Sequence, residues 1–428
     1  MNEIPRRAAL TTFASVFAST MLAPQLRLEA LELPAAGGGP EDEAYWRHVR
    51  HAFDLPEGIT NLDNGNTGPP PRAVMKNLIR YMRYAEELPA TRLGELARTT
   101  MKVVVPRVAA VLGVATEEIA LQRNATEALD TVLLGVPLRA GDEVLCSAHD
   151  YWAMLDALEQ RRARDGIVLR MIHPPMPAAS LAELAQLYEA EITPRTRLVL
   201  LTHASNLTGQ LYPVKRIAAA AHKVGAEVVV DAAQTFALFP HTVADLDCDY
   251  YGASLHKWLL APVGSGVLWV RKPLVDKVWP LFPPSAGAAW AAGMMRFMAV
   301  GTYPMPLVAA ITAAVDLHET IGAVRKAERL RHLTRYWRTK LEGLPGVRFY
   351  TTNAPDASCG LAVFEIAGVD SEKLRDHLWD KHRIVVQAMQ QKGAPEIHGV
   401  RVTANVYTSR AELDRFVAAI ERVVEHGL

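Results

Sequence analysis

Cysteine is scarce in this chain, and its scarcity excludes two classes of protein. The 428 residues include only Cys146, Cys248 and Cys359, which lie far apart in the sequence. Their number is odd, and their spacing fits neither a disulfide framework nor a zinc site. Cys146 and Cys359 stand among apolar residues, so we expect both to be buried core side chains.

An excess of charge and long apolar runs are also missing. The chain carries 46 basic and 46 acidic residues, so its formal net charge is zero. Proteins that bind nucleic acid need clustered surplus Lys and Arg to neutralise phosphates, and the even balance predicts no such partner. No apolar stretch reaches about 18 residues, so no membrane span is expected.

Sequence motifs of several other enzyme classes are absent too. The pair His318-Glu319 is not followed by the second histidine of a His-Glu-x-x-His zinc motif. There is no Gly-x4-Gly-Lys-Ser/Thr phosphate loop and no Gly-x-Ser-x-Gly nucleophile motif. Gly264 and Gly266 do not complete a dinucleotide-binding fingerprint. We therefore expect neither a metal site nor any of these chemistries.

The stretch from Val228 to Lys257 is the most informative part of the sequence. The β-branched run that begins at Val228 leads into Asp231, at the carboxyl end of a predicted parallel strand, where open α/β sheets bind ligands. Lys257 follows a second short apolar run. Pyridoxal phosphate (PLP) needs an amine for its aldehyde and an acidic partner for its ring nitrogen. Taken singly, a surface lysine and a helix-capping aspartate are the simpler interpretation; the combination favours a PLP site.

Strands and helices alternate along most of the chain. Polar groups end four predicted strands, at Ser147, Thr202, Asp231 and the Lys257 segment. This alternation predicts an α/β protein with a mostly parallel sheet and one ligand-binding edge. We expect helical structure over 72–113, 152–165, 180–190 and 213–223, a long connector helix over 305–343, then strands at 360–365 and 400–404 with helices at 371–381 and 411–426. The expected domains are 1–37 (signal peptide and linker), 38–65 (N-terminal segment), 66–305 (large PLP-binding domain) and 306–428 (connector helix and small domain).

The N-terminus has features of an export signal. Arg6-Arg7 precedes an uncharged, mildly apolar run that ends near Ala23, which resembles a twin-arginine signal more than a membrane helix. The twin-arginine machinery carries folded proteins, which suits a protein that acquires PLP on folding. We therefore expect a periplasmic or otherwise exported protein. A disordered or amphipathic N-terminus on a cytoplasmic protein is the alternative.

The segments Asp231 to Gln234 and Ser254 to Lys257 resemble the class V aminotransferase family of PLP-dependent enzymes. The resemblance extends from about Asn61 to Asp414. It implies fold type I of the PLP-dependent transferases, with a mostly parallel, seven-stranded-type sheet in a large domain and a smaller α+β C-terminal domain. The segment Asn61 to Pro71, whose polar groups could line the mouth of a site, looks most like isopenicillin N epimerase-like members. An exported member would also resemble the periplasmic PLP enzyme of pyoverdine maturation.

The resemblance implies a role for each residue of a cofactor site. Lys257 would form the Schiff base with PLP and later act as a base, and an ionised Asp231 would keep the ring nitrogen protonated. His149 would stack on the ring, with Tyr151 as the runner-up and as a substrate contact. The other candidates for cofactor binding are Ala125, Thr126, Asn206, Gln234, Ser254, His256 and Thr302 of the partner subunit. Arg401 would bind the carboxylate of the substrate, for which its bidentate geometry is suited.

The implied activity is that of a homodimeric enzyme acting at the Cα of an amino acid or of a peptide-borne amino group, by epimerisation or transamination. Desulfurases of the family carry a nucleophilic cysteine in the region from Val385 to Val400, and this chain has none there. Persulfide chemistry is therefore disfavoured. A PLP-dependent lyase or desulfurase-like enzyme, and a catalytically inactive PLP-fold protein that binds a ligand, remain as alternatives.

Overall fold

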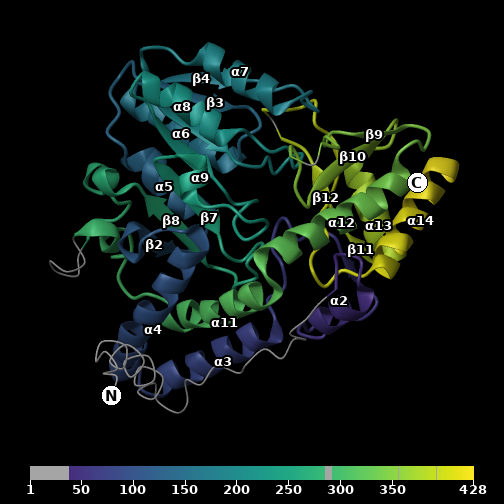
Figure 1. The fold of residues 1–428 in the computed structure, drawn as a ribbon, viewed down its shortest axis with the longest axis horizontal. Coiled ribbons are helices and arrows are strands. Elements are labelled where there is room, and N and C mark those ends of the chain that lie inside the picture. The colour runs from purple at the N-terminus through teal and green to yellow at the C-terminus, as the bar shows by residue number, and fades with distance from the viewer. Residues whose placement is uncertain (1–37, 285–291, 355, 392) are drawn as a thin grey trace, which may run out of the picture.

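A seven-stranded sheet forms the centre of the larger part of the molecule (Figure 1). The structure is a computed structural model, which describes residues 38–284, 292–354, 356–391 and 393–428. The strands are β2 (Ile119–Gln122), β3 (Glu143–Ser147), β4 (Val168–Ile172), β5 (Thr196–Thr202), β6 (Glu227–Asp231), β7 (Tyr250–Ser254) and β8 (Gly266–Val270). Their order is β2-β8-β7-β6-β5-β3-β4, and only β8 runs antiparallel to its neighbours. The mostly parallel sheet predicted from the sequence is confirmed.

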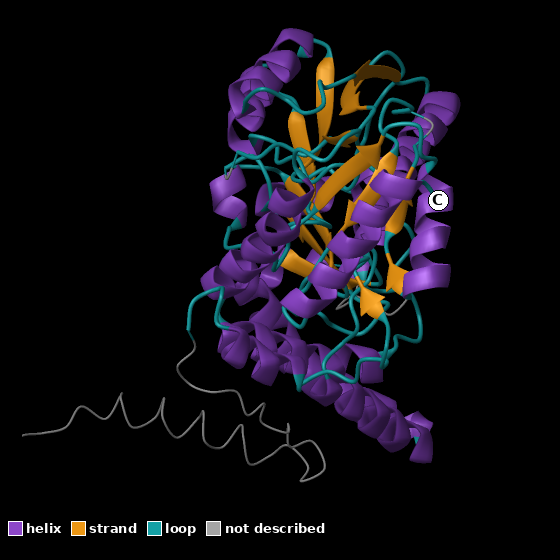
Figure 2. Cartoon of the chain, turned by 90° about the vertical axis from the view of Figure 1, so that its right-hand side faces the viewer, coloured by secondary structure: helices purple, strands orange, loops and turns teal. Residues whose placement is uncertain are grey.

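Helices cover both faces of this sheet, as Figure 2 shows. Those that connect its strands are α5 (Ala125–Gly135), α6 (Trp152–Asp165), α7 (Leu181–Glu191), α8 (Val214–Lys223) and α9 (Val243–Leu246). Short 3-10 turns lie at η2 (Thr116–Glu118), η3 (Lys272–Lys277) and η4 (Gly293–Phe297). Because both faces are covered, the central strand β6 has no polar side: Val228, Val229 and Val230 are all fully buried.

Two stretches predicted as continuously helical are each divided in two. The first consists of α3 (Arg72–Glu87) and α4 (Pro89–Leu112), because Leu88 precedes a proline and takes a φ of −155°. The second consists of α11 (Met305–Ile321) and α12 (Ala323–Leu341), which meet at Gly322 with a bend of 79°. The single long helix expected over 305–343 was therefore wrong. Within the described residues no single helix could span a membrane; α11 and α12 qualify only as a bent pair, by length and composition.

The C-terminal part of the chain forms a second, smaller layer. A four-stranded antiparallel sheet has the order β12-β13-β10-β9. Its elements are β9 (Val347–Phe349), β10 (Ala362–Ile366), β12 (Gln387–Met389) and β13 (Gly399–Val402), with helices α13 (Ser371–His382) and α14 (Arg410–His426). A capping box begins α14: the Ser409 hydroxyl accepts a hydrogen bond from Glu412 N, and the Glu412 side chain accepts one from Ser409 N.

The predicted N-terminal segment is attached to this C-terminal part. Its helix α2 (Glu43–Arg50) is followed by β1 (Thr60–Asn61), which pairs in parallel with β11 (Ile384–Val385). Trp46 of α2 belongs to a buried cluster that also holds Trp258, in the loop between β7 and β8, and Leu361 next to β10. The wall between the two sheets is thus built from three distant parts of the chain.

Candidate active site

A cavity of about 310 Å³ lies at the carboxyl ends of β5, β6 and β7. Parallel strands bring their carboxyl ends to one edge of a sheet, so residues distant in sequence meet there. Nine of the twelve predicted site residues line it: Ala125, Thr126, Tyr151, Asn206, Asp231, Gln234, Ser254, His256 and Lys257. The convergence of these side chains, predicted from separate motifs, makes this cavity the candidate active site.

Lys257 is the amine of the cavity. Burial lowers the pKa of Lys257 to about 8, while Asp231 raises it, Arg401 lowers it further and Asp63 raises it. In the described part of the chain its ammonium has no hydrogen-bond or ion-pair partner. A lysine with a depressed pKa is partly neutral near pH 8 and can attack an aldehyde.

Asp231 is the buried carboxylate. It ends β6 with 6% of its surface exposed, and its Oδ1 accepts a hydrogen bond from Ala233 N at 2.9 Å. Burial raises the pKa of Asp231, whereas the Ala233 N–H and Lys257 lower it. A protonated ring nitrogen beside this carboxylate would favour its charged form. That Asp231 is ionised stays a prediction.

The N-terminus of α5 supplies a site for an anion. Asn124 caps the helix by accepting from Glu127 N at 2.8 Å, and Ala125 N donates to Ser254 Oγ at 2.9 Å. Thr126 stands in the first turn on the cavity wall. A Cβ on Gly266 would lie 2.7 Å from the Asn124 backbone, so only glycine lets β8 approach this turn. Backbone N–H groups and the helix dipole favour a phosphate here.

The chemistry of these groups fits PLP. The cavity joins an amine of lowered pKa, a buried carboxylate and a helix N-terminus, which correspond to the aldehyde, the ring nitrogen and the phosphate of PLP. His256 borders the same wall, and its Nδ1 is 3.0 Å from the Ser265 carbonyl, which orients the ring. The described residues contain no group of three or more side chains that could hold a metal ion.

His149 lies in the turn after β3 and is not among the residues that line the cavity. It is fully buried, and its Nε2 lies 3.0 Å from Glu396 Oε1. Burial lowers the pKa of His149, although Glu396 acts in the opposite direction. Tyr151, the runner-up for stacking, lines the cavity. Which of the two rings stacks on the cofactor stays a prediction.

Arg401 and Thr302 also lie off the cavity wall of this chain. Arg401, on β13, pairs with Asp63 at 2.9 Å and donates to the Asn206 carbonyl at 3.1 Å. Its guanidinium, 5% exposed on the side chain, already has a carboxylate partner, so its binding of a substrate carboxylate stays a prediction. Thr302 is exposed to solvent. Its expected role in the site of a partner subunit also stays a prediction.

Sequence reasoning missed several residues of the site. Asn66 and Thr67 line the cavity; they belong to the turn-rich entry segment, whose polar groups were expected at the mouth of the site without individual roles. Met154, on α6, and Arg123, before α5, line it as well. Each stands within three residues of a predicted site residue, Tyr151 or Ala125. Trp258 directly follows Lys257, but its hydrogen bond to Gln234 could not be read from the sequence.

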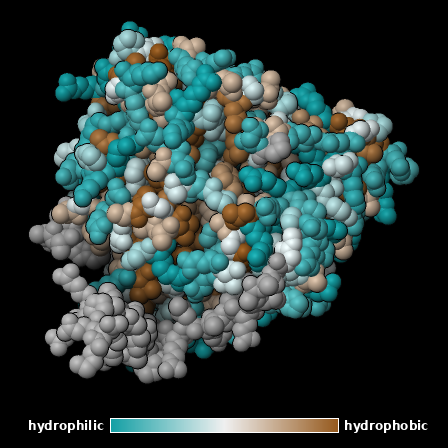
Figure 3. Space-filling model, viewed as in Figure 1, coloured by the Kyte–Doolittle hydropathy of each residue, from teal (hydrophilic) through white to brown (hydrophobic). Residues whose placement is uncertain are grey.

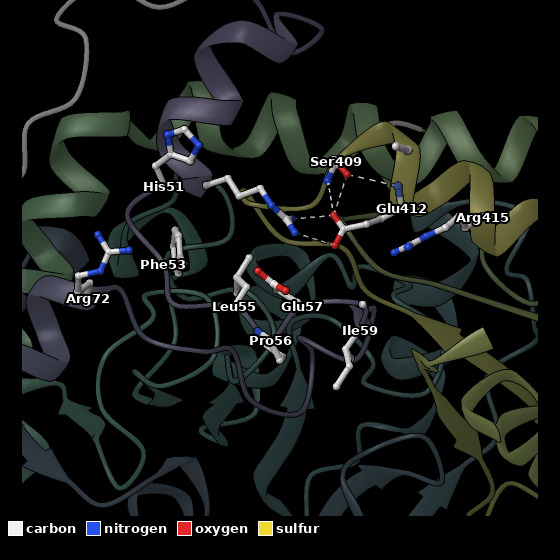
Figure 4. A pocket seen from close by; sticks show the side chains of 13 residues that line it. His51, Phe53, Leu55, Pro56, Glu57, Ile59, Arg72, Ser409, Glu412 and Arg415 are labelled. Carbon is white, nitrogen blue, oxygen red and sulfur yellow. Dashed lines mark hydrogen bonds and ion pairs between the residues drawn. The ribbon is translucent and has the colours of Figure 1, made fainter. Parts of the chain in front are cut away.

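A second hollow, of about 820 Å³, lies between α14 and the segment that follows α2 (Figure 4). Arg50 donates to Glu412 at 2.7 and 3.1 Å, and Glu412 accepts from Ser409 N at 2.8 Å. Arg72 pairs with Asp54 at 2.8 Å. None of the twelve predicted residues borders this hollow.

Comparisons with known proteins match almost the whole chain. A model of the family described as Aminotransferase class-V matches residues 60–416. The isopenicillin N epimerase of Amycolatopsis lactamdurans is 30% identical in an alignment of 398 positions, which covers 88% of this chain and 98% of the epimerase. A cysteine desulfurase of Enterobacter sp. (strain 638) is 29% identical in an alignment of 399 positions, which covers 88% of this chain and 95% of that enzyme.

Solved structures share the fold. The apo structure of a cysteine desulfurase from Thermococcus onnurineus NA1 has a TM-score of 0.79 and 24% identity, covering 92% of this chain and 100% of that chain. The cysteine desulfurase CsdA from Escherichia coli has a TM-score of 0.78 and 24% identity, covering 91% and 99%. The predicted α/β architecture of fold type I is confirmed.

Proposed function

Because this chain belongs to the class V aminotransferase family of PLP-dependent enzymes, we propose that it acts at the Cα of an amino acid or of a peptide-borne amino group, by epimerisation or transamination. The observation that carries the proposal is the placement of Lys257 and Asp231 in one cavity, with the pKa of the lysine lowered to about 8. The similarity to two isopenicillin N epimerases, at 30% and 28% identity, favours epimerisation among these reactions.

Each residue has a defined task in this proposal. PLP, when bound, supplies the electron sink that makes a Cα proton acidic. Lys257 would hold the cofactor through Nζ, and the same Nζ, once free, would accept the proton from the Cα of the substrate. Asp231 would pair with the ring nitrogen and keep it protonated. The N–H groups at the start of α5, with Thr126 and Ser254, hold the phosphate and keep the ring in register.

Elimination of a side-chain group is the second candidate, favoured by the 29% identity to a cysteine desulfurase. Persulfide transfer needs an accessible thiol, and the three cysteines of the chain are buried and absent from the cavity wall. Burial raises the pKa of Cys359 to about 12, and its Sγ lies 3.6 Å from the Gly209 carbonyl. The chemistry therefore favours a reaction that needs no cysteine. A protein that binds PLP without turnover is the remaining alternative.

Incubation of the holoenzyme with candidate amines in deuterated water separates these outcomes. Epimerisation gives a product of the opposite hand with one deuterium at Cα and the amino group retained. Transamination gives a keto product, and elimination gives loss of the side-chain group, all resolved by mass spectrometry. The proposal fails for each tested amine if no deuterium enters and no product forms while PLP is bound.

We also propose that the active unit is a homodimer with shared sites. Helix α3 presents Met75, Ile79 and Met82 to solvent, 38, 46 and 50% exposed, in one stripe at helical spacing. The face in Figure 3 is mostly hydrophilic, with apolar groups scattered over it. A two-fold interface over the α3 stripe would cover apolar surface and bring Thr302 of the partner subunit toward the phosphate.

Mixed dimers test the sharing of sites. Lys257→Ala and Thr302→Trp subunits, each inactive alone, are exchanged at equal concentration. If the sites are shared, half of the random dimers carry one complete site, so about a quarter of all sites recover activity. A fully active monomer in dilute solution, or no recovery after proven exchange, would contradict the shared site.

Export by the twin-arginine route is a further part of the proposal. It is supported by the sequence alone, because residues 1–37 lie outside the described residues. Residues 1–40 fused to a reporter that functions only when exported folded should give signal. Replacement of Arg6 and Arg7 by lysine should abolish it. Equal export of that double variant would contradict the twin-arginine route, and no export of the wild-type fusion would favour a cytoplasmic protein.

A further inference from the structure

The side-chain amide of Gln234 has one possible orientation. Trp258 Nε1 donates to Gln234 Oε1 at 3.1 Å, and Gln234 Nε2 donates to the Gly65 carbonyl at 2.9 Å. A flipped amide would set a donor against the indole N–H and an acceptor against the carbonyl. Gln234 is 3% exposed and lines the cavity, so its second Nε2 hydrogen is what it can offer to a bound molecule.

The backbone of Trp258 is also fixed by a hydrogen bond. It follows Lys257 directly, is fully buried, and its carbonyl oxygen accepts a hydrogen bond from Lys326 Nζ. Lys326 lies in α12, in the part of the chain that leaves the large sheet for the small one (Figure 1). The contact therefore ties the peptide next to the reactive lysine to the connector helix.

Lys326 is an unusual core residue. It is 2% exposed, and no carboxylate in the described residues pairs with it. Burial lowers the pKa of Lys326 to about 7, and the nearby His318 of α11, whose own pKa burial and Lys326 lower to about 3, brings no negative charge. A buried amine without an anionic partner lowers the stability of the fold. We therefore expect the hydrogen bond of Lys326 to the Trp258 carbonyl to have a role beyond packing.

We propose that Trp258 and Lys326 are positioning residues that act through Gln234: Lys326 fixes the Trp258 peptide, the Trp258 indole fixes the Gln234 amide, and that amide donates a hydrogen bond to an anionic ring oxygen of the cofactor. The inference rests on the proposed PLP site. Trp258 and Lys326 do not line the cavity, yet they would set the electronic state of the linkage between Lys257 and PLP.

The expected effect has a definite sign. The negative charge of the ring oxygen stabilises the protonated form of the neighbouring Lys257 nitrogen. A hydrogen-bond donor that stabilises the ring oxygen weakens its attraction for this proton. A well-oriented donor therefore lowers the pKa of the Lys257 nitrogen in its linkage to PLP. Removal of the donor or of its support raises that pKa, which the visible absorption of the bound cofactor reports directly.

Trp258→Phe is the first test, because it keeps an aromatic ring and removes the N–H donor. In a spectrophotometric pH titration of the holoenzyme, the midpoint should rise by about half a unit to one unit. The kcat value should fall while KM stays nearly constant, since Trp258 does not line the cavity. Trp279→Phe is the matched control: Trp279 is 72% exposed, and its replacement should leave the midpoint unchanged.

Lys326→Met keeps the aliphatic stem and removes the donor to the Trp258 carbonyl. It should shift the midpoint in the same direction as Trp258→Phe and by less, because the Trp258 indole N–H remains. Lys102→Met, on the exposed side of α4, is the control for the loss of a lysine. Melting temperatures measured in parallel separate a global loss of stability from a shift of the titration.

A double-mutant cycle decides whether Trp258 acts through Gln234. In a Gln234→Leu background, Trp258→Phe should add no further shift of the midpoint, because the amide is already gone. An equal shift in both backgrounds, or no shift in either single variant, would overturn the inference although wild-type protein still carries PLP on Lys257. Absence of PLP on Lys257 in the wild-type protein would instead overturn the proposed function. If Trp258→Phe does not fold, the same cycle is run with Lys326→Met.

Discussion

The two hollows of the molecule differ in how their charged groups are partnered. Around the surface hollow of Figure 4, two arginines are paired with carboxylates of the same chain, Arg50 with Glu412 and Arg72 with Asp54. In the cavity at the sheet edge, Lys257 has no partner in the described chain, and burial raises the pKa of Asp231. The smaller hollow therefore holds the more strongly perturbed charged groups.

The pairing of the charged groups says more about function than the volumes of the two hollows do. Strongly perturbed titratable groups cost stability, and they gather where a ligand or a reaction needs them. The cavity of about 310 Å³ holds a lysine whose pKa is lowered to about 8, while in the hollow of about 820 Å³ Arg50 and Arg72 are paired with carboxylates.

The largest effect is expected for Lys257→Ala. The variant removes the amine that binds the aldehyde, so added PLP should give no visible band that borohydride fixes to the protein. Turnover should fall by at least about a thousandfold. Peptide mass spectrometry of reduced wild-type protein locates the label, and Lys102→Ala serves as the control. A label on another lysine would contradict the assignment.

Asp231→Ala comes second. The Lys257 amine remains, so PLP should still attach, but the ring nitrogen loses the carboxylate that keeps it protonated. Turnover should fall by about two to four orders of magnitude, as expected when an electron sink fails. Absorption spectra record attachment and steady-state assays record turnover. Near-normal turnover of this variant would rule out the role of Asp231.

The rate at which PLP attaches to the apoprotein should depend on pH in a smaller, graded way. Neutral lysine is the nucleophile, so the rate should rise as pH increases through about 8, the lowered pKa of Lys257, and then level off. Stopped-flow absorption measures this profile. A rise centred near the pKa of an exposed lysine, about 10.4, would show that the cavity does not perturb Lys257.

Much of the site could be predicted because its information is local in sequence. Asp231 and Lys257 each stand at the end of an apolar strand, and parallel strands place such ends together. The contact of His149 with Glu396 could not be predicted in this way, because the two residues lie 247 positions apart in the chain. The contact of Lys326 with the Trp258 carbonyl spans 68 residues and left no local pattern either.

The fold shows the same limit. The strand and helix alternation of the large domain follows from short periodic segments, and these were predicted closely. The break between α11 and α12 was missed because a single glycine inside a helical pattern is usually tolerated. Gly322 adopts φ 85° and ψ 132°, a conformation set by how the two helices pack, so the sharp bend became apparent only in three dimensions.

The smallest effect is expected at the surface hollow, for Arg50→Met. Arg50 is 31% exposed and binds Glu412 through both terminal nitrogens, so its loss should lower the free energy of unfolding by about 1 kcal/mol. Arg72→Met removes a pair whose side chains are 46% and 70% exposed, and should change stability by less than about 0.5 kcal/mol. Neither variant should alter the absorption of bound PLP or its pH midpoint. Denaturant unfolding and the spectrophotometric titration measure the two quantities on the same samples. A shift of the midpoint in Arg50→Met would mean that the two hollows are coupled, and the contrast between them would then have to be abandoned.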